Sequence, residues 1–151
     1  MYESISTLER LADEHRSLIE VVRDIDRLDG PCESGVVHEL EQIVDALLAH
    51  LGCTLGATEE LVYSLLSREL GRADADEIER DHREIHRCVT HLQQGRIDLR
   101  EDAIDHVAEV RRELHATASA VRLHLDREEL VYLHLLEERL RPISRAPGGA
   151  R

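Results

Sequence analysis

Four stretches of the chain repeat apolar residues every three or four positions, and each carries a histidine where the repeat would place Leu or Val. This spacing is typical of amphipathic α-helices that bury one face. The four histidines are His15, His50, His82 and His124. A polar side chain buried without a partner costs about 1 to 3 kcal/mol, so four of them need a common partner inside the fold. A bound metal ion would satisfy all four.

The helical stretches set the expected architecture. They cover residues 8–25, 36–50, 74–95 and 107–135, with stops expected at Gly30-Pro31, near Gly95 and before Pro142. Short polar connections between amphipathic helices favour an all-α fold, an up-down-up-down four-helix bundle. We expect this bundle to occupy residues 1–141 and residues 142–151 to form a flexible C-terminal tail.

The two halves of the chain resemble each other. Residues 13–16 (Asp-Glu-His-Arg) parallel residues 80–83 (Arg-Asp-His-Arg), and the string Glu-Glu-Leu-Val-Tyr occurs at both 59–63 and 128–132. Each half therefore carries one histidine on its first helix and another ahead of the repeated string. The sequence predicts an internal two-fold repeat of helical hairpins.

The charge of the chain excludes several functions. Thirty-two acidic against nineteen basic residues give a formal charge of -13, which repels nucleic acid and anionic membranes. The chain has no Lys, Phe or Trp, so it lacks a lysine nucleophile and a platform of these rings for base stacking. No apolar run approaches the roughly 20 residues of a membrane span, and no secretory leader is recognised. We expect a cytoplasmic protein, a monomer or weak dimer, without nucleic-acid or membrane partners.

The cysteines indicate neither a disulfide crosslink nor a structural zinc site. Cys32, Cys53 and Cys88 are odd in number and widely spaced, and no CxxC pair occurs. This pattern predicts neither a disulfide framework nor a structural zinc site.

Further ligands follow from helical spacing. Glu128 lies four residues after His124 and so projects from the same face, while Glu129 suits an exposed position. His86 follows His82 by the same step, so either both imidazoles reach one cation or His86 is a partly exposed flank residue. Imidazole and carboxylate ligands suit iron, manganese or zinc. More ligands are present than one tetrahedral zinc ion needs, which favours a dinuclear site.

The heights of the histidines conflict on one pair of helices. At about 1.5 Å per residue, His82 lies roughly 20 Å from its hairpin end and His124 roughly 35 Å. Either residues 95–104 form a longer, partly non-helical connection, or His115 is the ligand. We keep His124 because Glu128 accompanies it.

The residues resemble the hemerythrin-like, or HHE cation-binding, family of non-heme di-iron four-helix bundles. The matching elements span about residues 8–138 and are Glu14-His15, His50, Asp81-His82 with His86, and His124-x-x-x-Glu128-Glu129. The resemblance implies two iron ions (Fe2+/Fe3+) joined by two carboxylates and a bridging oxo or hydroxo group. It also implies an open position for a small ligand: dioxygen, peroxide or nitric oxide.

The second helix departs from the family pattern. The family expects a glutamate four residues after His50, where Thr54 stands; Glu59 aligns through the repeated string, nine residues after His50. Five extra residues at about 100° each rotate the face by roughly 140°, so we predict that residues 52–57 bulge or loop out to present Glu59 as the second bridge. Without the bulge, Thr54 or Cys53 faces the metal. The sequence leaves open whether Glu59 or the adjacent Glu60 bridges.

Two tyrosines follow the expected bridging glutamates. Tyr63 and Tyr132 lie four residues after Glu59 and Glu128, on or beside the metal-facing stripe. Each phenol would either donate to a bound oxygen species, donate an electron, ligate iron directly, or pack in the core with its hydroxyl at an edge.

The predicted metal ligands are His15, His50, Glu59, His82, His86, His124 and Glu128. The main hypothesis is a di-iron protein that binds or reduces dioxygen, peroxide or nitric oxide, including a peroxide- or NO-consuming oxidoreductase; its electron donor is unknown. The alternatives are an iron-binding or iron-delivery module without redox turnover, and a structural bundle interacting through its acidic face. By the resemblance, oxygen carriers enclose the gas in an aromatic pocket, so the absence of Phe and Trp disfavours simple oxygen carriage.

Overall fold

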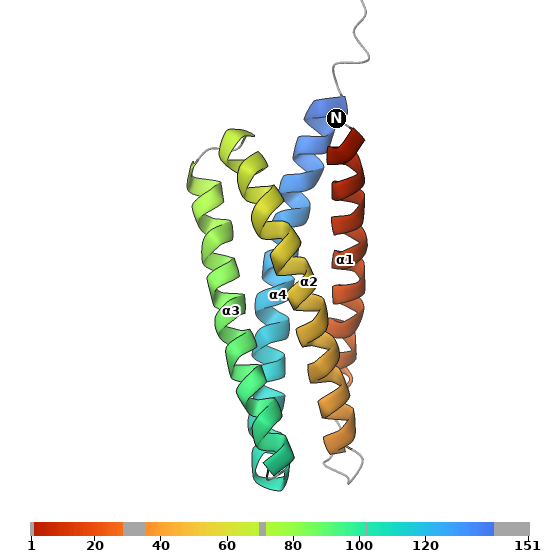
Figure 1. Cartoon of the computed structure of the whole chain (residues 1–151), viewed down its shortest axis with the longest axis vertical. Coiled ribbons are helices and arrows are strands. Elements are labelled where there is room, and N and C mark those ends of the chain that lie inside the picture. The colour runs from red at the N-terminus through yellow and green to blue at the C-terminus, as the bar shows by residue number, and fades with distance from the viewer. Residues whose placement is uncertain (1, 29–35, 70–71, 102, 141–151) are drawn as a thin grey trace, which may run out of the picture.

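In the computed structural model the backbone is described for residues 2–28, 36–69, 72–101 and 103–140. Side chains are described for residues 10, 12–28, 36–56, 76–101 and 105–130. These backbone ranges form four α-helices: α1 (Tyr2–Asp26), α2 (Val36–Glu69), α3 (Arg72–Glu101) and α4 (Ala103–Leu140). Successive helices run in opposite directions (Figure 1). The predicted all-α four-helix bundle is confirmed, whereas the internal two-fold repeat stays a prediction and the expected tail lies outside the described residues.

The apolar stripes of the helices meet in one core. α3 packs most extensively against α4, α1 packs against α2, and α2 also contacts α3. Fully buried side chains from each helix fill the interior, among them Leu18, Leu47, Ile85 and Leu114. Burying such a side chain stabilises the fold by about 1.5 to 3 kcal/mol. The stripes read from the sequence are therefore the faces that hold the bundle together.

The expected end of the third helix at Gly95 is wrong, because α3 continues to Glu101. Gly95 serves a close approach between α3 and α4: a Cβ at this position would lie 2.9 Å from Cγ2 of Val110. Beyond Gly95, Leu99 is buried in the core, and its burial stabilises the continuation of the helix. The partly non-helical connection expected over residues 95–104 is thus wrong for residues 95–101.

The longer helix removes the conflict in heights. His82 now lies nineteen residues before the end of α3, about 28 Å, and His124 lies twenty-one residues after the start of α4, about 32 Å. The two side chains therefore lie at nearly the same height along the α3–α4 hairpin, which is required if both are to bind one ion.

The bulge predicted at residues 52–57 is also wrong, because α2 is helical throughout this segment. Gly52 and Gly56 are exposed, whereas Leu51 and Leu55 are buried in the core. An interior glycine costs a helix about 1 kcal/mol relative to alanine. The burial of each leucine offsets such a cost, so the apolar spacing outweighs the two glycines and keeps α2 continuous.

None of the described helices is both long enough and apolar enough to cross a bilayer.

Candidate metal centre

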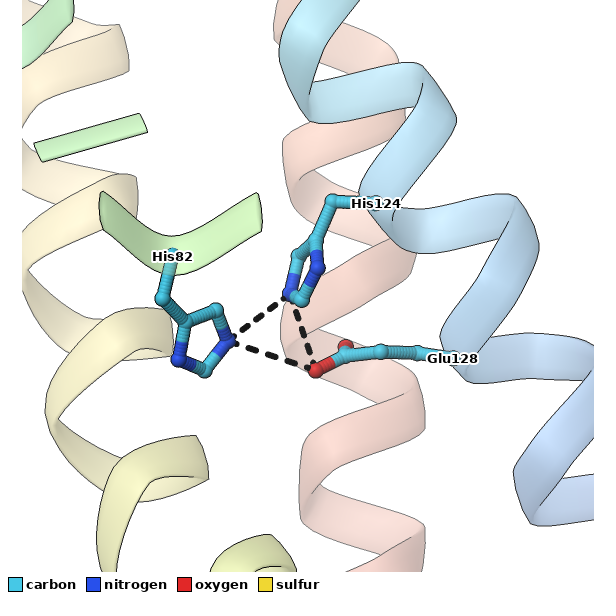
Figure 2. A group of neighbouring side chains, drawn as sticks. All are labelled: His82, His124 and Glu128. Atoms are coloured by element: carbon cyan, nitrogen blue, oxygen red, sulfur yellow. Dashed lines mark hydrogen bonds and ion pairs between the residues drawn. The ribbon is translucent and has the colours of Figure 1, made fainter. Parts of the chain in front are cut away.

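Three side chains that could hold a metal ion converge in the interior between α3 and α4 (Figure 2). They are His82, His124 and Glu128, here called the inner triad; each is 2% exposed or less. Nε2 of His82 lies 3.0 Å from Nε2 of His124. Oε1 of Glu128 lies 2.9 Å from Nε2 of His124 and 3.7 Å from Nε2 of His82. Three ligand atoms from two helices therefore face one point.

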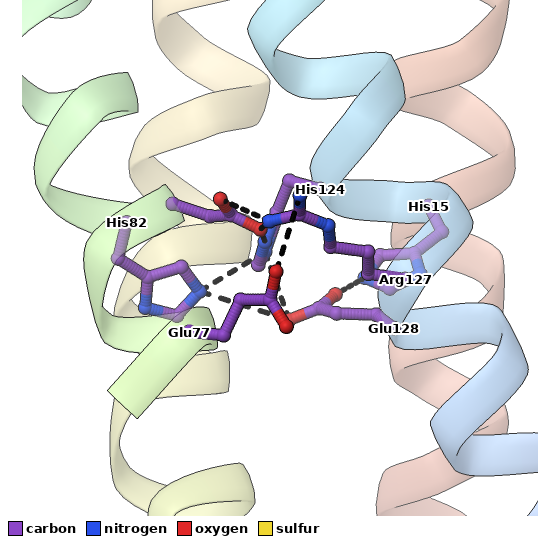
Figure 3. Close-up of polar contacts among 7 residues, drawn as sticks. His15, Glu77, His82, His124, Arg127 and Glu128 are labelled. Atoms are coloured by element: carbon purple, nitrogen blue, oxygen red, sulfur yellow. Dashed lines mark hydrogen bonds and ion pairs between the residues drawn. The ribbon is translucent and has the colours of Figure 1, made fainter. Parts of the chain in front are cut away.

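His15 approaches the same carboxylate from α1 (Figure 3). Its Nε2 lies 2.8 Å from Oε2 of Glu128, and its side chain is largely buried. The two oxygens of Glu128 thus face different imidazoles: Oε1 faces His82 and His124, and Oε2 faces His15.

Helical spacing places the triad. On α3, His82 lies between the buried Ile78 and Ile85, at the position of the stripe where an aliphatic residue would otherwise stand. On α4, Glu128 follows His124 by four residues and shares its inward face. The same periodicity that builds the core therefore also aims the polar groups into it.

Glu128 carries a negative charge inside the bundle. Burial raises the pKa of this carboxyl group, but contacts with the imidazoles of His124, His15 and His82 outweigh burial and hold the pKa well below its usual range. Neither of its oxygens accepts a hydrogen bond of good geometry from a described side chain. A buried carboxylate is costly unless a cation or strong donors compensate it. The site is therefore suited to a metal ion.

The spacing of the ligand atoms fits such an ion. Imidazole nitrogens and carboxylate oxygens bind metals at about 2.0 to 2.2 Å, which puts neighbouring ligand atoms roughly 3.0 to 3.5 Å apart. The three distances within the inner triad are 3.0, 2.9 and 3.7 Å. Nitrogen and oxygen ligands of this kind suit iron as well as manganese and zinc.

Two other predicted histidines lie outside the inner triad. His50 is half-buried on α2, and His86 is exposed on α3 although it follows His82 by four residues. His115, the alternative to His124, is half-buried nine residues earlier on α4 and also lies outside the triad. The assignment of His50 and His86 as ligands stays a prediction.

The remaining candidates on α2 divide between described and undescribed positions. The side chains of Glu59, Glu60 and Tyr63 lie outside the described residues, as does that of Tyr132 on α4. With α2 continuous, Thr54 is the buried residue one turn after His50, and Cys53 is exposed. Among the described side chains, the family's second carboxylate thus has Thr54 in its place.

Sequence reasoning missed an ion-pair network beside the triad (Figure 3). Nη1 of Arg127 donates to both oxygens of Asp81 at 2.7 Å, and Nη2 of Arg127 lies 3.3 Å from Glu77. Oδ2 of Asp81 lies 3.9 Å from Nδ1 of His124. An ion pair between two helices leaves no periodic spacing in the sequence of either helix. The one available sign was adjacency, since Asp81 precedes His82 and Arg127 precedes Glu128.

Comparison with known protein families bears on this geometry. The model of the hemerythrin HHE cation-binding domain matches residues 6–136. The chain belongs to this family. The hemerythrin HHE domain spans all four helices and includes the inner triad and His15. Membership implies that the domain binds a cation, which agrees with the buried ligand group. Neither the comparison with curated proteins nor that with solved structures gave a match.

Proposed function

We propose that this hemerythrin-family protein is a non-heme iron protein that binds or reduces dioxygen, peroxide or nitric oxide. The observation that carries the proposal is the convergence of His82, His124 and Glu128 inside the bundle. Two imidazoles and one carboxylate leave coordination positions free for an exogenous ligand, a pattern associated with iron that reacts with oxygen. Iron bound in this site would supply a redox-active Lewis acid.

The residues have distinct roles in this proposal. His82, His124 and Glu128 would hold one iron, and His15, together with Glu128, would contribute to holding a second. This division follows the contacts of 2.8 Å to Oε2 and 2.9 Å to Oε1. We propose two iron ions with an oxo or hydroxo bridge, and Glu128 as a carboxylate bridge between them. On α2 the buried Thr54 stands where the family pattern expects a second bridge.

The amino-acid composition favours reaction with a small oxidant over reversible oxygen carriage. The chain supplies no Phe or Trp to enclose a bound gas molecule in an aromatic, water-poor pocket. We therefore propose consumption of a small oxidant, not oxygen storage, as the main activity.

Reconstitution with ferrous iron tests the proposal. Purified protein is loaded under anaerobic conditions, freed of excess iron and assayed for iron per chain; the visible spectrum is then followed after addition of oxygen, peroxide or nitric oxide. Two irons per chain with a change in the spectrum support the proposal. Bound iron that does not react with any of these oxidants favours the alternative, an iron-binding or iron-delivery module. Failure to retain stoichiometric iron refutes both.

A matched pair of variants on α3 tests the ligand set. His82→Ala removes a buried member of the triad, and His86→Ala removes an exposed imidazole one turn later. We expect His82→Ala to lose iron. An equal loss in His86→Ala assigns that residue as a ligand, as the four-residue spacing predicts, whereas unchanged iron content excludes it.

A further inference from the structure

Asp81 occupies the space behind the metal-facing ring of His124. Its carboxylate is 12% exposed, and Oδ2 lies 3.9 Å from Nδ1 of His124, the ring nitrogen that points away from the triad. This Nδ1 is buried and has no hydrogen-bond partner among the described residues. Nε2 of the same ring faces Glu128 and His82. The imidazole thus presents one nitrogen to the ligand group and the other to a carboxylate.

We propose that Asp81 is the positioning residue of the metal centre: its carboxylate accepts the Nδ1 hydrogen of His124 and so keeps the Nε2 lone pair on the metal. The proposal rests on the iron binding proposed above. Imidazole carries one hydrogen in its neutral form, and the nitrogen that loses it is the one able to bind metal. Metal-binding histidines commonly donate their other N–H to a carboxylate, which fixes both tautomer and ring orientation.

The network around Asp81 holds it in place for this role. Nη1 of Arg127 bonds both carboxylate oxygens at 2.7 Å, and the other terminal nitrogen of Arg127 contacts Glu77. Arg127 therefore keeps Asp81 on the inner side of α3 while leaving lone pairs on Oδ2 free to accept from His124. A hydrogen bond needs about 2.7 to 3.2 Å, so the separation of 3.9 Å between Oδ2 and Nδ1 has to shorten by roughly 1 Å for the bond to form.

A purely structural role is the competing explanation, because the Asp81–Arg127 pair also joins α3 to α4. The chain offers a matched comparison away from the metal. Arg96 on α3 bonds both oxygens of Asp45 on α2 at 2.9 and 3.1 Å, so this pair also joins two helices. If Asp81 only joins helices, its loss will resemble the loss of Asp45.

The experiment measures Co2+ binding by full-length Asp81→Ala, Asp81→Asn and Asp45→Ala proteins. Dissociation constants come from competition with a chelating dye, and Fe2+ content is measured in parallel. We expect Asp81→Ala to raise the dissociation constant roughly 10- to 100-fold. Asp81→Asn, which keeps an oxygen acceptor and the shape of the side chain, will fall between Asp81→Ala and the wild type. Asp45→Ala will bind Co2+ as the wild type does.

Proton NMR of the Co2+ protein supplies a readout that helix joining would not move. The Nδ1 hydrogen of a metal-bound His124 gives a paramagnetically shifted, exchangeable signal, and its hydrogen bond to Asp81 slows exchange with water. We expect this signal in the wild type and its loss through fast exchange in Asp81→Ala.

Unchanged Co2+ affinity and unchanged exchange in Asp81→Ala overturn the inference, as does an equal loss of affinity in Asp45→Ala. Should Asp81→Ala fail to fold, the Asp81→Asn protein decides. Faster exchange of the Nδ1 hydrogen than in the wild type supports the inference, and an equal exchange rate overturns it. A wild type that binds neither Co2+ nor Fe2+ refutes the proposed function instead.

Discussion

Glu128→Gln isolates the contribution of negative charge to the metal centre. The side chain is 0% exposed, and its two oxygens face three imidazoles at 2.8, 2.9 and 3.7 Å. Glutamine has nearly the same shape, so the substitution removes the charge while the packing of α4 is retained. A divalent ion in the variant would be surrounded by neutral ligands in a buried site.

The size of the effect follows from the burial of the group. Removing one charged partner from a buried pair costs about 3 to 5 kcal/mol, because the other charge is left uncompensated. A tenfold change in affinity corresponds to about 1.4 kcal/mol, so the metal dissociation constant should rise roughly 150- to 4,000-fold. Thermal stabilisation by metal should fall with it. Metal at 1,000 times the dissociation constant stabilises the fold by about 4.1 kcal/mol, but only by about 0.4 kcal/mol once that constant has risen a thousandfold.

The assay combines Co2+ competition with thermal unfolding followed by circular dichroism, with and without metal. Glu129→Gln is the matched control, because Glu129 is the next residue on α4 and is exposed. We expect this control to bind metal like the wild type. A change of less than tenfold in Glu128→Gln, or an equal change in Glu129→Gln, would refute the assignment of Glu128 as the charged ligand.

Three further predictions concern the same helices. His124→Ala should abolish iron retention while His115→Ala retains it, as measured by iron content per chain; the reverse result would move the site along α4. Gly95→Ala should lower the free energy of unfolding in urea by about 1 kcal/mol, because crowding against Val110 costs about 1 to 3 kcal/mol and helix propensity returns about 1 kcal/mol; in a Val110→Ala background the same change should instead stabilise. Burial raises the pKa of the Cys88 thiol, with a smaller contribution from a nearby glutamate. Iodoacetamide should therefore modify this thiol slowly at neutral pH and faster only as the pH rises. Rapid labelling at neutral pH, measured by peptide mass spectrometry, would contradict this prediction.

The fold could be predicted from sequence because its strongest signal is periodic. The stripe around Leu18 and the stripe around Leu114 each mark one buried face of a helix, and both lie in the core. Helix ends were less predictable, since glycine has two uses. Gly95 was interpreted as a stop, but it permits the close approach of Val110, a contact between helices that no local pattern records.

The candidate site was predictable to the extent that it follows a single helix. The four-residue step from His124 to Glu128 gives a shared face, and the structure brings both beside His82. The same step from His82 to His86 leads to an exposed position, because the buried face of α3 is too narrow to include both. The contact of Asp81 with Arg127 joins two helices, and helical spacing within either one contains no information about it.

All three members of the inner triad come from one hairpin, α3 and α4, which is also the pair of helices in most extensive contact. Among the described side chains, the other hairpin adds His15 to this group. The centre is therefore modular: residues inserted into α2 change the register of one hairpin without separating the donors on the other. Thr54 on α2, where the chain departs from the family pattern, lies on the hairpin that contributes none of the inner triad.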